Sequence, residues 1–147
     1  MKKNEQLQLW LEAWDPNPES PLPREYRAYF HCFNSGQYYE AHDVLEHLWL
    51  RCTDSNRSFY QGLIQLAGAF VHFRKHADAP THPTHSRRLG PGQRLLDLAS
   101  GRLRSYGASH LEVNIEMVLK LCVLWKERAT LGSPLQTYPA PQLILLQ

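Results

Sequence analysis

The sequence predicts an all-α fold, a compact helical bundle of about five or six helices in a single domain spanning residues 1–147. Apolar side chains recur at spacings of three and four residues through most of the chain, and no segment shows the alternation of a half-buried strand. The length is sufficient to bury roughly two thirds of the unfolded surface around one core. Within this domain we expect a motif core at 24–75, a loop at 76–92 and an apolar tail at 134–147.

The first three helices are delimited by turn-forming residues. The first is expected to end near Trp14, because the segment 15–18 contains two prolines. The second is expected over about 24–33. A turn at 34–36 that ends in glycine then leads directly into the third helix, expected over about 37–51, so these two helices should form a tight hairpin.

Three further helices follow from their periodicity. The fourth, expected over about 57–75, is apolar on almost all sides and should form the centre of the bundle. The fifth is expected over about 93–106. The sixth is expected over about 109–131, because it opens with a capping-box pattern and carries Glu116 and Lys120 as an i,i+4 pair on its wet side.

Composition excludes several classes of function. Sixteen Lys and Arg residues against fourteen Asp and Glu residues give a net charge of +2, too small a bias to imply a nucleic-acid or membrane partner. No stretch approaches the roughly 20 apolar residues that span a bilayer, and no signal-peptide core precedes Trp14. Cys32, Cys52 and Cys122 lack the spacing of a zinc site or a disulfide framework. We therefore expect a cytoplasmic protein with reduced thiols and neither a nucleic-acid nor a membrane partner.

Polar, titratable side chains occupy one face of the third helix, where a bundle helix should be apolar. At about 100° per residue, His42, Glu46 and Trp49 share a narrow face that should point toward the core. A carboxylate beside an imidazole orients the ring tautomer and stabilises the imidazolium, as a general base requires. We therefore expect His42 and Glu46 to be the catalytic pair, with Trp49 as a wall of the site.

A second polar stripe runs along the fourth helix. Gln61, Gln65 and His72 fall on one line, and no Lys, Arg, Asp or Glu occurs between Arg57 and Arg74. A helix without charge over about four turns is normally buried, so the stripe predicts an internal polar pocket shared with the third helix. The glutamines would hold a polar substrate there.

Structural interpretations of the same residues stay open. A buried His–Glu pair can serve helix packing alone, since most satisfied polar networks only rigidify a core. Gln61 can instead close a capping box with Ser58, and the whole stripe can be the solvent face of its helix. The sequence therefore leaves both a functional and a structural role for these side chains.

No cofactor and no metal are expected, although one metal site is a minor alternative. His42, Glu46 and His72 would supply two imidazoles and a carboxylate, a common set of ligands for a catalytic divalent metal. The chain lacks an HExxH segment and the paired Glu-x-x-His segments of di-iron bundles. Loop histidines such as His82 and His85 are expected to be solvated and to capture metal only adventitiously.

Residues 33–46, together with Trp49, resemble the signature of a small all-helical family known only as domain of unknown function 309. The similarity continues through Arg57, an aromatic pair and the segment 61–65 to His72. The resemblance implies a compact helical bundle in which a set of polar and aromatic positions cluster, and it implies no established activity. These positions are Glu40, His42, Glu46, Trp49, Arg57, Gln61, Gln65 and His72, of which all but His42 and Glu46 are expected to bind substrate.

Two classes of function remain open from the sequence. The first is an enzyme, a small-molecule hydrolase or isomerase in which His42 is the base and Glu46 orients it. The second is a non-catalytic ligand-binding or scaffold protein whose polar network is structural. The expected partner is a small polar molecule, and the apolar tail at 134–147 should dock on the domain or on a second subunit of a homo-oligomer.

Overall fold

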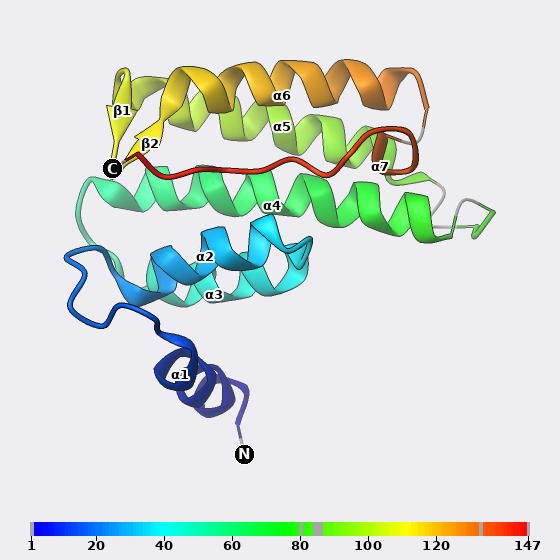
Figure 1. Cartoon of the computed structure of the whole chain (residues 1–147). Coiled ribbons are helices and arrows are strands. Elements are labelled where there is room, and N and C mark those ends of the chain that lie inside the picture. Colours follow the sequence, from blue (N-terminus) through cyan, green and yellow to red (C-terminus); the bar gives the residue numbers. More distant parts are fainter. Residues whose placement is uncertain (1, 80, 84–86, 133, 147) are drawn as a thin grey trace.

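The computed structural model describes residues 2–79, 81–83, 87–132 and 134–146 and confirms the all-α class (Figure 1). The described elements are α1 (Lys3–Trp14), α2 (Arg24–Asn34), α3 (Tyr38–Arg51), α4 (Asn56–Asp78), α5 (Leu89–Leu103), the 3-10 turn η2 (Arg104–Tyr106), β1 (Ser109–His110), β2 (Val113–Asn114), α6 (Ile115–Thr130) and α7 (Pro134–Thr137). Figure 1 shows α4 between the α2–α3 pair and the α5–α6 pair, with α1 outermost beside α2 and α3.

α4 forms the centre of the bundle, as its apolar sequence predicts. Its residues Leu63 and Phe70 are fully buried, and the Tyr29 hydroxyl on α2 donates to the Leu63 carbonyl at 2.7 Å. On the opposite side α5 approaches α4 closely at Gly92. A Cβ atom at Gly92 would lie 2.9 Å from Cδ1 of the buried Phe73 ring, so this contact requires glycine.

α2 and α3 form the predicted helical hairpin. Gly36 adopts a positive φ of 76°, the left-handed conformation that commonly ends a helix. The Gln37 amide then donates to the Cys32 carbonyl at 2.8 Å, which closes the turn and starts α3 one residue later. The two polar-stripe helices, α3 and α4, are therefore consecutive in the chain and adjacent in space.

The loop predicted at 76–92 is shorter than expected. α4 continues to Asp78, and α5 begins at Leu89 rather than at residue 93. Pro91 lies in the first turn of α5, where its missing N–H leaves no helical hydrogen bond unmade and its fixed φ suits a helix. The run of Gly and Pro at 90–92 therefore starts a helix instead of ending a loop.

The prediction that residues 109–112 open the sixth helix is wrong, because these residues belong to an antiparallel hairpin of β1 and β2. Leu111 and Glu112 have φ values of 44° and 64°, as the two central residues of a type I′ turn require. The helix begins after this turn, and the Asn114 side chain caps it by accepting from the Met117 amide at 3.1 Å.

The C-terminal tail docks on its own chain, which confirms one of the two expected arrangements. The Asn34 side chain donates to the Leu143 carbonyl at 2.8 Å and accepts from the Leu143 amide at 2.7 Å. Farther on, the Leu146 amide donates to the Glu112 carbonyl at 2.6 Å. The tail thus runs as an extended segment past the end of α2 to the β1–β2 turn, and in the view of Figure 1 it lies between α4 and α6 (red).

The end of α1 is fixed to α2 through Asp15, whose side chain is only 2% exposed. Its carboxylate accepts from Arg27 Nη1 at 2.5 Å and from Arg24 Nε at 2.9 Å. These hydrogen bonds hold the pKa of Asp15 well below its usual range, with Arg27 as the largest cause. Among the described residues, none of the helices combines the length and the apolarity that crossing a bilayer requires.

Candidate functional site

α3 and α4 pack antiparallel, and a cation–aromatic contact joins them near each end. Arg57 Cζ lies 4.1 Å from the ring centroid of Trp49, where α3 ends and α4 begins. Lys75 Nζ lies 5.1 Å from the ring centroid of Tyr39, at the other end of the pair. The sides of the two helices that carry these four residues therefore face each other.

The α3 stripe lies on its facing side. The α4 stripe lies between that side and α5, because a Cβ atom at Gly68 of the same stripe would come within 3.2 Å of Leu95 Cδ1 of α5. At about 100° per residue, the α3 stripe falls within the arc of about 80° that includes Tyr39 and Trp49, and the α4 stripe falls within the arc of similar width that includes Arg57 and Lys75. We call the region between them the α3–α4 seam. Its residues are His42, Glu46 and Trp49 on α3 and Gln61, Gln65 and His72 on α4.

His42 and Glu46 are half-exposed, so the prediction that they point into the core is wrong. Their side chains are 33% and 45% exposed. The buried stripe of α3 is instead formed by Tyr38, Ala41, Val44, Leu45 and Leu48. This stripe lies about 100° around the helix axis from His42 and Glu46. The site predicted as internal is therefore a partly solvated seam at the rim of the core.

His42 lies between two carboxylates. Its Nδ1 is 3.3 Å from Asp43 Oδ1, within hydrogen-bond reach, and its Nε2 is 3.8 Å from Glu46 Oε2, which is ion-pair but not hydrogen-bond distance. Asp43 is also paired with Lys3 of α1 at 3.0 Å. The arrangement holds the imidazole at the mouth of the seam with a carboxylate near each ring nitrogen.

Two polar atoms of the α4 stripe are buried without a hydrogen-bond partner in the part of the chain that the structure describes. They are the amide oxygen of Gln65 and Nδ1 of His72. Buried polar atoms are nearly always satisfied, and leaving one unpaired costs about 1–3 kcal/mol. The α4 stripe therefore contains an acceptor and a ring nitrogen that the described protein leaves unpaired.

Arg88, the N-cap of α5, contributes a third atom of this kind near His72. Its Nε is buried and has no hydrogen-bond partner among the described residues. Burial lowers the pKa of His72, and the positive charges of Arg88, Lys75 and Arg94 lower it further. Both effects favour the neutral form of the His72 imidazole. Arg88 is absent from the predicted site residues because it lies in the segment predicted as a loop, and its position in the sequence has no periodic relation to the stripe of α4.

Arg57 and Trp49 form the closed end of the seam. Besides lying over the Trp49 ring, Arg57 donates from Nη1 to the Trp49 carbonyl at 2.8 Å and to the Cys52 carbonyl at 2.9 Å. The last carbonyl groups of a helix have no partner within that helix, and Arg57 supplies one for those at the end of α3. The indole Nε1 of Trp49 is a further buried atom without a partner in the described chain.

Glu40 does not lie with the other predicted site residues. It lines a separate hollow of about 300 Å³ between α1 and α3, together with Trp10, Cys32 and Asp43. It also lines a hollow of about 260 Å³ between the start of α3 and the end of α4, with Tyr39, Arg74 and Lys75. Burial, and secondarily the charge of Glu40, raises the pKa of the Cys32 thiol to about 11. Neither hollow contains another of the predicted site residues, so Glu40 borders one end of the α3–α4 pair and does not cluster with them.

The proposed metal ligands do not come together in the described structure. Among the residues it describes, no three or more His, Cys, Asp and Glu side chains form a group that could hold a metal ion, and this includes His42, Glu46 and His72. His85 of the second histidine cluster lies outside the described residues.

The fold and the seam define an all-α bundle protein with a partly solvated polar seam between two antiparallel helices. The family model described as Domain of unknown function (DUF309) matches residues 26–81. The resemblance inferred from the sequence is thus confirmed for this segment, which contains most of α2 and all of α3 and α4, and so both sides of the seam. No curated protein and no solved structure shows significant similarity to the chain.

Proposed function

We propose that the α3–α4 seam binds a small polar molecule that carries an anionic group, a carboxylate or a phosphate. The observation that carries this proposal is the set of unpaired buried atoms on the seam, the amide oxygen of Gln65 and Nδ1 of His72. A ligand hydroxyl or amine that donates to Gln65 would remove the cost of the unpaired oxygen, and this favours the bound state.

The charge of the ligand follows from the end of the seam near α5. The unpaired Nε of Arg88 can donate to an anionic oxygen, and charge-assisted hydrogen bonds of this type are the stronger ones. His72 Nδ1 can donate or accept in the neutral ring, so it can satisfy either kind of ligand atom. Positive charge from Arg94 and Lys75 adds attraction that is weaker and sensitive to salt.

Titration of the His72 ring by NMR tests this proposal. Inorganic phosphate or acetate bound at the seam neutralises the surrounding positive charge, so the pKa of His72 should rise toward its ordinary value when either anion is added. Arg88→Gln should abolish the rise. Arg104→Gln removes the same charge at the far end of α5 and should leave it intact. An unchanged His72 titration with both anions, or equal loss in both variants, contradicts the proposal.

A second candidate function, hydrolysis or isomerisation of the bound molecule, is favoured by the position of His42. The ring lies at the mouth of the same seam, 3.8 Å from Glu46 and open to solvent, where it could take a proton from water or substrate. Ester and phosphate-ester reporter substrates would test this. His42→Ala should remove the activity and His47→Ala, on the same helix, should retain it. Anion binding without any turnover would leave the protein a non-catalytic ligand-binding protein.

A further inference from the structure

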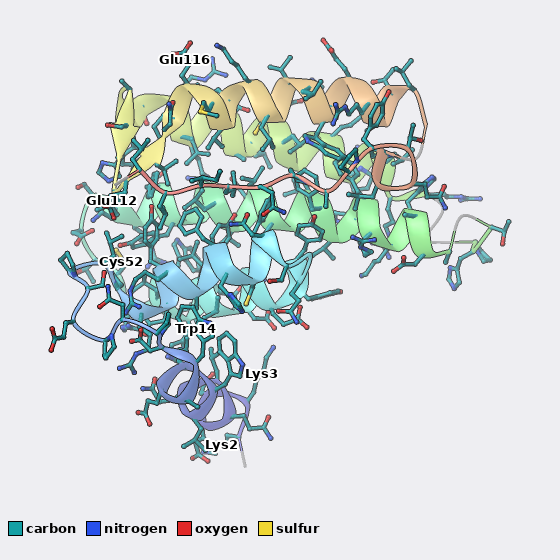
Figure 2. The ribbon with its side chains drawn as sticks, viewed as in Figure 1. Lys2, Lys3, Trp14, Cys52, Glu112 and Glu116 are labelled. Atoms are coloured by element: carbon teal, nitrogen blue, oxygen red, sulfur yellow. The ribbon has the colours of Figure 1, made fainter. Side chains whose placement is uncertain are left out.

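The outer face of α6 exposes apolar side chains that nothing in the described chain covers. Val123, Leu124 and Leu131 are 59%, 43% and 80% exposed. Figure 1 shows α6 at the edge of the bundle, and Figure 2 shows Glu116 pointing outward from it. Single exposed apolar residues are ordinary, but neighbouring ones along one helix face are typical of an interaction surface.

The charges on this face are arranged symmetrically around the apolar centre. Lys120 lies one turn before Val123 and Leu124, and Glu127 lies about one turn after them. These residues also line a shallow surface hollow. Lys120 forms an exposed ion pair with Glu116 of its own helix at 3.2 Å, whereas no ion pair to Glu127 occurs among the described residues.

We propose that α6 pairs with α6 of a second copy of this chain, with the helices antiparallel about a two-fold axis between Val123 and Leu124. In this register Val123 meets the partner's Leu124, and Lys120 meets the partner's Glu127. Each contact occurs twice, as a two-fold interface requires. A parallel pair would instead place Lys120 against the partner's Lys120, so the charge order selects the antiparallel arrangement.

The α6 face also fits a second copy better than the C-terminal tail does. A second subunit is one of the two expected contacts of the tail, but Leu143 is buried against its own domain and bonded to Asn34. The α6 residues have the three- and four-residue spacing that lets side chains of two helices interdigitate. This inference is independent of ligand binding at the α3–α4 seam, which lies on other helices.

Sedimentation equilibrium over a range of protein concentrations tests the pairing. The unmodified chain should form a dimer. Lys120→Glu and Glu127→Lys each create two like-charge contacts, and each should weaken the dimer about tenfold or more. The double variant Lys120→Glu with Glu127→Lys should restore it, because both contacts regain opposite charges. Lys2→Glu on α1 makes the same charge change away from α6 and should have no effect.

Mixing the two single variants gives a second and stricter readout. A chain with Lys120→Glu and a chain with Glu127→Lys have complementary contacts, so the heterodimer should form where neither homodimer does. Circular dichroism confirms that each variant is folded. A chain that stays monomeric at every concentration, or a dimer that neither single variant weakens, overturns the proposal.

Discussion

Arg57 lies over the indole of Trp49, with Cζ 4.1 Å from the ring centroid, and its Nη1 donates to the carbonyl of the same residue at 2.8 Å. One side chain therefore ends α3 and holds it against the start of α4. The spacing of the two helices at this end of the seam depends on that double contact, and so does the position of the polar atoms farther along.

Replacing Arg57 should weaken both the fold and the seam. Arg57→Ala removes two hydrogen bonds to carbonyl groups and a cation–aromatic contact, and the free energy of unfolding should fall by about 1–2 kcal/mol. Arg57→Lys keeps the charge but lacks the planar guanidinium, so it should recover only part of this loss. Urea unfolding of the three proteins measures the difference. Full recovery by lysine would show that charge alone matters.

The contact between α4 and α5 predicts opposite effects for two glycines of one helix. Gly92→Ala would push a methyl group against the buried Phe73 ring and should destabilise the fold by about 1–3 kcal/mol. Gly101→Ala, also on α5, meets no heavy atom within 4 Å and should stabilise the fold by up to about 1 kcal/mol through helix propensity. Thermal melts compare the variants, and a tolerated Gly92→Ala would argue against this close packing.

Gln65 distinguishes a binding seam from a structural network. In the absence of ligand its buried amide oxygen has no partner in the described chain, so Gln65→Met should leave the free energy of unfolding unchanged or raise it by about 1 kcal/mol. If the network instead serves packing, the same change should cost about 1–3 kcal/mol.

His42→Ala should be nearly neutral in the same unfolding measurement, because the ring is half-exposed and Glu46 remains solvated. A large loss in either variant would favour the structural role.

Asp15 should give the fold a stability contribution that depends on pH. Its pKa is lower in the folded state than in the unfolded chain, where it is near 3.8. The stabilisation is therefore present above about pH 4 and is lost as pH falls toward the folded-state pKa. Asp15→Asn should lower the melting temperature clearly at pH 6, and the difference from the unmodified chain should shrink as the pH approaches 2. A difference independent of pH would contradict this assignment.

The sequence predicts which residues share a helix face better than it predicts how deeply they are buried. Helical periodicity fixes the angle about the helix axis between His42 and Glu46, because both residues belong to the same helix. It does not fix the rotation of that helix about its own axis, which depends on packing with α2 and α4. The face of α3 with Leu45 and Leu48 buries more apolar surface than the face with His42 and Glu46 would. α3 therefore packs with the leucine face toward the core and the His42 and Glu46 face toward solvent.

Other features had no readable signal in the sequence. The type I′ turn at Leu111 and Glu112 lacks the Asn or Gly that usually marks one, so the helix-capping pattern at 109–112 was the stronger indication. Arg88 lies at the start of α5, and its charge lowers the pKa of His72 on α4; such proximity between elements depends on the tertiary fold. By contrast, the uninterrupted apolar character of α4 was sufficient to predict its central position.

The hydrogen bonds between Asn34 and Leu143 close a loop of more than a hundred residues in a fold whose other contacts are mostly between helices close in sequence. The entropy lost in closing such a loop is recovered only when the elements between its ends are already in place. The helices can therefore form and pair early, since their contacts are short in sequence. We therefore expect the tail to dock late in folding and to be released early in unfolding.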